Sequence, residues 1–220
     1  MAPPDDTTSS GGPPCFQVSP SGASEPTSIE GQHIMETVKI ILLCVGAGIL
    51  YGILHDQVTA RVCVEYFTIG HPPVFDTESP TLLAFGWGVL ATWWVGLFLG
   101  ILMALASRVG TLPKYTAAHL IRPIAGLLVV MGCASLLAGI AGYFMADTGR
   151  VWLNEPLRLQ LSREKELAFI ADLWAHCTAY GVAAVGGIGL CFRVPFSRWR
   201  MSRAAQAHPH APVATAADGQ

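Results

Sequence analysis

Charged residues are scarce in this chain of 220 residues: they make up 13% of it, about half of the roughly 25% usual for a soluble domain. Hydrophobic residues make up 52%, and the mean hydropathy is +0.47. The formal net charge is −2, and no basic stripe offers a surface to nucleic-acid phosphates. This balance excludes an ordinary soluble enzyme, a coiled coil and a nucleic-acid-binding domain, and it indicates that lipid surrounds much of the chain.

The sequence also lacks the short motifs that identify common chemistry. It has no His-Glu-x-x-His, no Cys-x-x-Cys and no glycine-rich loop followed by Lys-Ser or Lys-Thr. Four of the six cysteines fall in apolar blocks, where a thiol behaves as a small hydrophobe. Cys15 lies near the start of the chain and Cys63 is the only cysteine of the outward loops, so we expect no disulfide between those loops.

Four apolar blocks follow one another, at about residues 37–54, 81–106, 123–145 and 167–192. A helix needs roughly 20 apolar residues to cross a bilayer, and three blocks reach that length comfortably. The first block is shorter and has an alternative interpretation as a cleaved signal peptide, which would leave three spans. Its acidic leader has no Lys or Arg, which is the wrong flank for a signal peptide. We therefore predict an all-α membrane protein with four transmembrane helices, forming one domain at residues 37–196.

The two ends of the chain have a different composition. Residues 1–36 are rich in Pro, Ser, Thr and Gly and contain five acids, which predicts a disordered tail. Residues 197–220 predict a tail that is first basic and then disordered. With four spans, eight Lys and Arg residues fall on the side of the two tails and five on the other side. The positive-inside tendency places both termini in the cytoplasm.

Each apolar block contains a pair of small residues spaced four apart. Such pairs let membrane helices approach closely, so we interpret them as packing positions. The pairs are Gly48 with Gly52, Gly96 with Gly100, Ala138 with Gly142, and Ala183 with Gly187.

The two outward connections predict a small extracytoplasmic cap. Apolar residues alternate with polar ones from Val58 to Tyr66, which is typical of a short half-buried β-strand. Gly70-His71-Pro72-Pro73 then predicts a turn. In the later connection, Ser162 precedes two glutamates and indicates the start of a helix.

The first connection also carries a longer motif, His55-Asp56-Gln57 continuing to Glu65-Tyr66-Phe67-Thr68-Ile69-Gly70-His71-Pro72. With this motif the chain resembles a group of small bacterial membrane proteins with several spans and no assigned activity. The similar region extends through Asp172-Leu173-Trp174-Ala175-His176 and covers most of the chain outside the tails. The resemblance implies the bacterial inner membrane as the location and adds no catalytic residues.

Ionisable residues inside an apolar block are costly and are functional candidates. Asp172 and His176 lie one helical turn apart on one face of the fourth block. Residues of the first connection approach Asp172 at the same side of the membrane, and their imidazole and carboxylate groups suit a transition metal such as zinc or iron. The candidate metal ligands are His55, Asp56, Glu65, His71, Asp172 and His176.

A structural role for the same residues is the competing interpretation, in which Asp172 and His176 satisfy each other or the backbone. Haem is disfavoured, because His55 is placed at a membrane boundary and His176 near the midplane.

Three functions remain open at this stage. The first is a non-enzymatic accessory component that contacts a membrane-protein partner or a second copy of itself. The second is a small metalloprotein or redox protein. An oligomeric transporter is the weakest of the three, because the chain has no evident inverted repeat.

Overall fold

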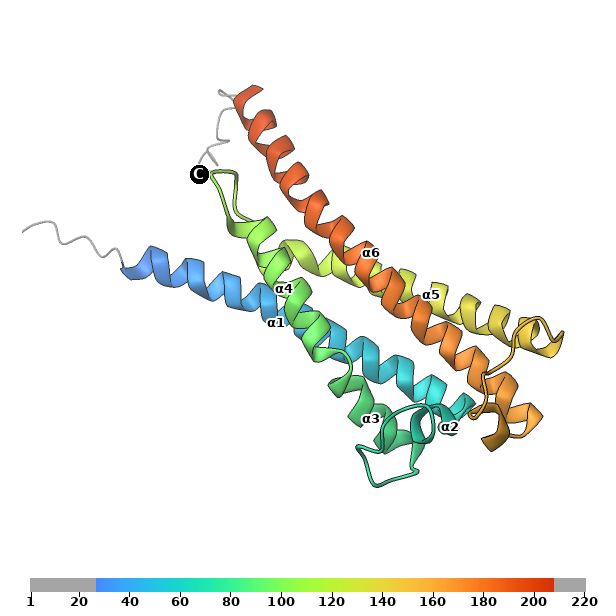
Figure 1. Ribbon diagram of the computed structural model, residues 1–220. Helices are drawn as coiled ribbons and strands as arrows, with labels where there is room; N and C mark the ends of the chain where they lie inside the picture. The colour runs from blue at the N-terminus through green and yellow to red at the C-terminus, as the bar shows by residue number, and fades with distance from the viewer. Residues whose placement is uncertain (1–26, 208–220) are drawn as a thin grey trace, which may run out of the picture.

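The computed structural model describes residues 27–207, with side chains from residue 30 onward, as a bundle of helices (Figure 1). The described part of the chain contains no strand. Its helices are α1 (Thr27–Val62), α2 (Val64–Thr68), α3 (Pro80–Leu90), α4 (Trp93–Arg108), α5 (Ala117–Asp147), the 3₁₀ turn η1 (Arg158–Gln160) and α6 (Arg163–Ala207).

Four segments of this bundle are long and apolar enough to cross a membrane. They are α1, α3 together with α4, α5 and α6, and their most apolar 18-residue windows have mean hydropathies of 2.2, 2.2, 2.3 and 1.4. This confirms the prediction of an all-α protein with four segments that are long and apolar enough to span a membrane. Consecutive spans run in opposite directions, so the connections 63–79 and 148–162 share one end of the bundle, which we call the α2 end (Figure 1).

The outer helices extend beyond the apolar blocks. α1 includes residues 27–36, which we expected in a disordered tail, and α6 continues to Ala207 through the basic segment. An ion pair between Lys39 and Glu36, at 2.8 Å and one turn apart, supports the polar start of α1. Arg and Ala, which are good helix formers, continue α6. The rest of the two predicted tails, residues 1–26 and 208–220, lies outside the described residues.

The predicted β-strand from Val58 to Tyr66 is wrong, because α1 continues to Val62 and α2 follows after Cys63. The buried residues here are Thr59, Ala60 and Cys63 at the end of α1 and Tyr66 in α2. Their spacing of one and three residues is the period of a helix, and they come from both faces of the expected strand, Thr59 and Cys63 from the polar face and Ala60 and Tyr66 from the apolar face. Short apolar alternation could not separate the two structures.

Small residues bring the helices into backbone contact. A Cβ atom added to Gly52 would lie 2.5 Å from the backbone oxygen of Gly88 in α3, and one added to Gly96 would lie 2.8 Å from that of Cys44. At Gly142 the added atom would meet the ring of Trp174 at 2.8 Å, and at Gly187 it would meet Leu99 at 2.9 Å. The spaced small residues therefore lie at helix contacts, as the pattern indicated.

The second span is interrupted where a single helix was expected. α3 ends at Leu90 and α4 begins at Trp93. The Thr92 hydroxyl donates a hydrogen bond to the backbone oxygen of Gly88, one turn back. Threonine side chains that bond to the preceding turn bend helices, which explains the break.

A buried arginine closes the opposite end of the bundle. Arg198 of α6 is 2% exposed, and its guanidinium donates hydrogen bonds to the backbone oxygens of Ala106, Val109, Leu112 and Pro113. The Ala106 carbonyl lies in the last turn of α4, where helical carbonyls have no partner within the helix, and the other three follow the end of α4. Arg198 thus holds the connection between α4 and α5.

We predict that Gly52→Ala separates α1 from α3. The new methyl group has no room beside the Gly88 carbonyl, so the substitution should lower the free energy of unfolding by about 1–3 kcal/mol. The matched control is Gly46→Ala on the same helix, where an added Cβ meets no atom within 4 Å. Thermal unfolding in detergent measures both variants, and equal melting temperatures for the two would contradict this packing.

Candidate metal centre

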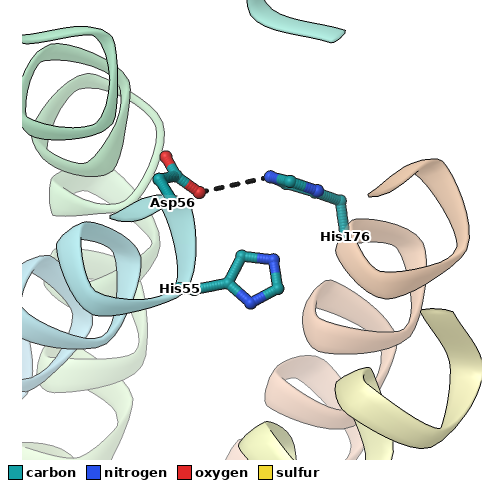
Figure 2. Close-up of side chains that lie close together, drawn as sticks. All are labelled: His55, Asp56 and His176. Atoms are coloured by element: carbon teal, nitrogen blue, oxygen red, sulfur yellow. Dashed lines mark hydrogen bonds and ion pairs between the residues drawn. The ribbon is translucent and has the colours of Figure 1, made fainter. Parts of the chain in front are cut away.

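Three of the six candidate ligands meet inside the bundle. His55 and Asp56 come from α1 and His176 comes from α6, and one ligand atom from each lies within 4.8 Å of the other two (Figure 2). Asp56 and His176 are 6% and 8% exposed, and His55 is half-buried. His55 precedes the end of α1 by seven residues, which is about 10 Å along the helix. The cluster therefore lies within the spans and not in the connections.

The backbone determines which nitrogen of His176 carries a proton. Nδ1 of His176 lies 2.8 Å from the backbone oxygen of Asp172, and a carbonyl oxygen only accepts. Nδ1 must therefore donate. Nε2, which lies 3.2 Å from Oδ1 of Asp56, is left as the nitrogen that faces the cluster (Figure 2).

A serine determines which nitrogen of His55 carries a proton. The Ser135 hydroxyl donates to the backbone oxygen of Ala175 at 2.9 Å, so its oxygen remains to accept from Nδ1 of His55 at 3.4 Å. Nε2 of His55 is buried and has no hydrogen-bond partner among the described residues. Figure 2 shows the His55 ring beside the Asp56 and His176 pair, with one nitrogen turned toward it.

Two nitrogen lone pairs and one carboxylate oxygen thus converge on one small volume. A proton on Nε2 of His176 would form an ion pair with Asp56, but it would leave Nε2 of His55 buried without a partner. A metal ion would satisfy all three atoms. Histidines that bind metals commonly donate the other ring N–H to a carbonyl or a similar group, as both histidines do here. At a metal–nitrogen distance of about 2.1 Å, tetrahedral ligands lie roughly 3.4 Å apart, so the widest separation in the cluster needs to contract by up to about 1.4 Å.

Aromatic side chains separate the cluster from the α2 end. The ring of Tyr66 lies 4.5 Å from that of His176, and the ring of Phe67 lies 5.8 Å from it. Both are nearly buried, at 8% and 2% exposed. On the other side, Tyr51 stacks on His55 at 5.6 Å with an angle of 15° between the rings. These rings restrict the access of water to the three ligands.

A cavity of about 110 Å³ adjoins the cluster; it is partly open to the surface, and we call it the internal cavity because it lies between the helices. It runs between α1, α4, α5 and α6, with His55, Asp56 and His176 among its lining residues. Most of the remaining lining is apolar, including Leu99, Met103 and Leu127. The three ligands therefore leave one side of a metal ion free to face a mainly apolar space.

The other three candidates lie outside the cluster. Glu65 pairs with Lys165 at 3.1 Å. Partial burial opposes ionisation of Glu65, but hydrogen bonds from its own backbone and from Lys165 hold the pKa of its carboxyl below the usual value. Nδ1 of His71 lies 2.8 Å from the backbone oxygen of Tyr66. Asp172 is 2% exposed and supplies its backbone oxygen to His176, while Oδ2 of its side chain has no partner among the described residues.

The two histidines are placed differently from the expectation that disfavoured haem. His55 and His176 do not lie at different depths, because their ring centroids are 4.5 Å apart at an angle of 77°. Two imidazole rings in contact leave no space for a porphyrin between them. The geometry disfavours bis-histidine haem for this reason and not for the one drawn from the sequence.

Two residues of the site escaped the sequence analysis. Ser135 orients His55, and Tyr51 stacks on it. A serine that stands alone among aliphatic residues of the third block was a signal for a polar role inside the bundle. Tyr51 precedes His55 by four residues on α1, and this helical spacing was the signal that the two rings are neighbours.

Comparison with family descriptions, curated proteins and solved structures yields no match for this chain. The resemblance noted from the first-connection motif therefore stays an expectation.

Proposed function

We propose that this chain is an integral membrane protein that binds one divalent transition-metal ion through His55, Asp56 and His176. The observation that carries the proposal is the orientation of both imidazoles by hydrogen bonds at Nδ1, which turns both Nε2 atoms toward the Asp56 carboxylate. Two nitrogens and one carboxylate oxygen favour zinc or iron(II) over magnesium or calcium, which prefer all-oxygen sites.

The open side of the cluster supports a reactive rather than a structural metal. Structural zinc is commonly closed by four protein ligands, whereas catalytic zinc and non-haem iron keep positions open for water or substrate. Here the fourth position faces the internal cavity. This favours a metalloprotein or redox protein over an accessory component without chemistry of its own.

The distribution of Lys and Arg supports the bacterial inner membrane orientation expected from the sequence, with both termini cytoplasmic and the α2 end extracytoplasmic. The metal site then lies closer to the extracytoplasmic side, beneath Tyr66 and Phe67.

We predict that the purified full-length protein, stripped with a chelator and reloaded with Zn²⁺ or Co²⁺, retains about one ion per chain. The variants His55→Ala and His176→Ala should each lose most of the bound metal, because the two ligands that remain do not hold the ion. Ser135→Ala should weaken affinity by about 10-fold to 100-fold, since it removes only the group that orients His55. Elemental analysis and competition with a chelator measure these effects.

His71→Ala is the matched control, because His71 is also a histidine of the α2 end but its side chain lies outside the cluster. Size-exclusion profiles show whether each variant is folded. Retention of less than about 0.2 ion by the unmodified protein, or equal losses in His71→Ala and His176→Ala, would favour a plain Asp56–His176 ion pair and contradict the proposal.

The orientation of the protein in the membrane can be tested with variants that carry a single cysteine in a cysteine-free background. The native Cys63 is a poor reporter, because it is 1% exposed and burial raises the pKa of its thiol to about 12. We expect a maleimide that cannot cross membranes to label Glu78→Cys on intact cells and to label Lys114→Cys only after lysis. The reverse pattern would show that the α2 end faces the cytoplasm.

A further inference from the structure

A second hollow lies on the outside of the bundle, between α1 and α5. This α1–α5 cleft has a volume of about 860 Å³ and is distinct from the internal cavity. Its walls include Leu54, Val58, Leu136 and Phe144, which are 59–63% exposed. In a membrane-spanning bundle such side chains face the hydrocarbon, so the cleft is accessible from the bilayer and not only from water.

Polar groups interrupt this apolar surface at the cleft floor, where Ser135, Asp172 and Ala175 lie. The Ser135 hydroxyl already donates a hydrogen bond to the backbone oxygen of Ala175, but Oδ2 of Asp172 has no hydrogen-bond partner among the described residues. Asp172 is 2% exposed. An unsatisfied polar atom at membrane depth is costly, and such residues mark binding sites in membrane proteins.

The absence of positive charge in the cleft limits the polar head group that a bound amphiphile can carry. No Lys or Arg lines it, so it offers nothing to a phosphate or a carboxylate. A hydroxyl group suits Asp172 in either protonation state, because it donates to a carboxylate and accepts from a carboxylic acid. The lining of α1 runs from Leu50 to Val62, which is about 18 Å of helix and the length of a long hydrocarbon chain.

We propose that the α1–α5 cleft binds a bilayer-soluble amphiphile with one long hydrocarbon chain and an uncharged head that carries a hydroxyl, such as a monoacylglycerol or a long-chain alcohol. The Asp172 side chain, whose Oδ2 is buried at the cleft floor, turns to receive the hydroxyl, and the apolar walls receive the chain. His55 and Tyr51 line both the cleft and the internal cavity, so the head lies next to the metal cluster. The inference rests on Asp172 and the cleft walls and does not depend on the metal.

The test is photolabelling of the full-length protein in nanodiscs. One probe is a monoacylglycerol with a diazirine and an alkyne in its chain, and the other is the fatty acid with the same chain. We expect the monoacylglycerol to label α1 and α5, to be displaced by unlabelled monoacylglycerol and to label at least about fivefold more than the acid. Asp172→Leu should reduce labelling about fivefold or more, since it removes the hydrogen bond to the head, and Asp172→Asn should retain much of it.

A matched glycine pair tests the cleft without touching a polar group. Gly132 lines the cleft and has no atom within 4 Å of an added Cβ, so Gly132→Phe should fill the cleft and reduce labelling. Gly126 on the same helix is equally open but lies outside the cleft lining, so Gly126→Phe should label as the unmodified protein does.

Equal labelling by both probes, unaffected by Asp172→Leu and by Gly132→Phe, would show annular lipid only and overturn the inference. His176→Ala separates the two proposals, because it should lose the metal and keep the labelling. Labelling as expected in a protein that binds no metal would contradict the proposed function alone.

Discussion

The candidate site depends on one kind of interaction, the hydrogen bond that each histidine makes through Nδ1. The Asp172 carbonyl accepts from His176, and the Ser135 hydroxyl, already committed to Ala175, accepts from His55. Each bond places a proton on the nitrogen that faces away from the cluster. The nitrogens that remain are both acceptors, and they face a third acceptor, Asp56. In a water-poor bundle a proton between Asp56 and His176 satisfies two of these three atoms, whereas a metal ion satisfies all three.

Helix packing supplies the positions of these groups. Glycine contacts bring α1 against α3 and α4, and α6 packs against α5 and α4 through Gly142 and Gly187. These contacts leave α1 and α6 on opposite sides of the internal cavity, joined across it by the Asp56–His176 pair. The aromatic residues of α2 cover one side of the cluster, and the α1–α5 cleft reaches it from the bilayer. A polar centre thus meets apolar space in two directions, which suits a membrane-soluble reactant better than an aqueous one.

The spans could be predicted from hydropathy, because length and apolar composition are enough to identify a helix that crosses a membrane. The spacing of small residues also indicated the helix contacts. The conformation of residues 58–66 could not be predicted, since alternation over a few residues fits a strand and a helix end alike. The break at Thr92 depends on one side-chain hydrogen bond, which composition does not reveal.

The residue types of the site could be predicted from the sequence, but not which of the candidate residues come together. Six candidates were expected on the same side of the membrane. The rotation of α1 and α6 decided that His55, Asp56 and His176 meet, and the position of α2 places Glu65 beside Lys165. Asp172 was singled out for its depth, yet its backbone carbonyl, a group common to every residue, is what orients His176. The spacing of four residues allowed this backbone contact but did not distinguish it from a contact between the two side chains.

Anomalous diffraction from crystals of the zinc-loaded protein, recorded at the zinc absorption edge, tests the central claim most directly. The account predicts a single strong peak about 2.0–2.2 Å from Nε2 of His55, Nε2 of His176 and a carboxylate oxygen of Asp56. A peak at Nδ1 of either histidine or beside His71, or no peak within the bundle, would contradict it.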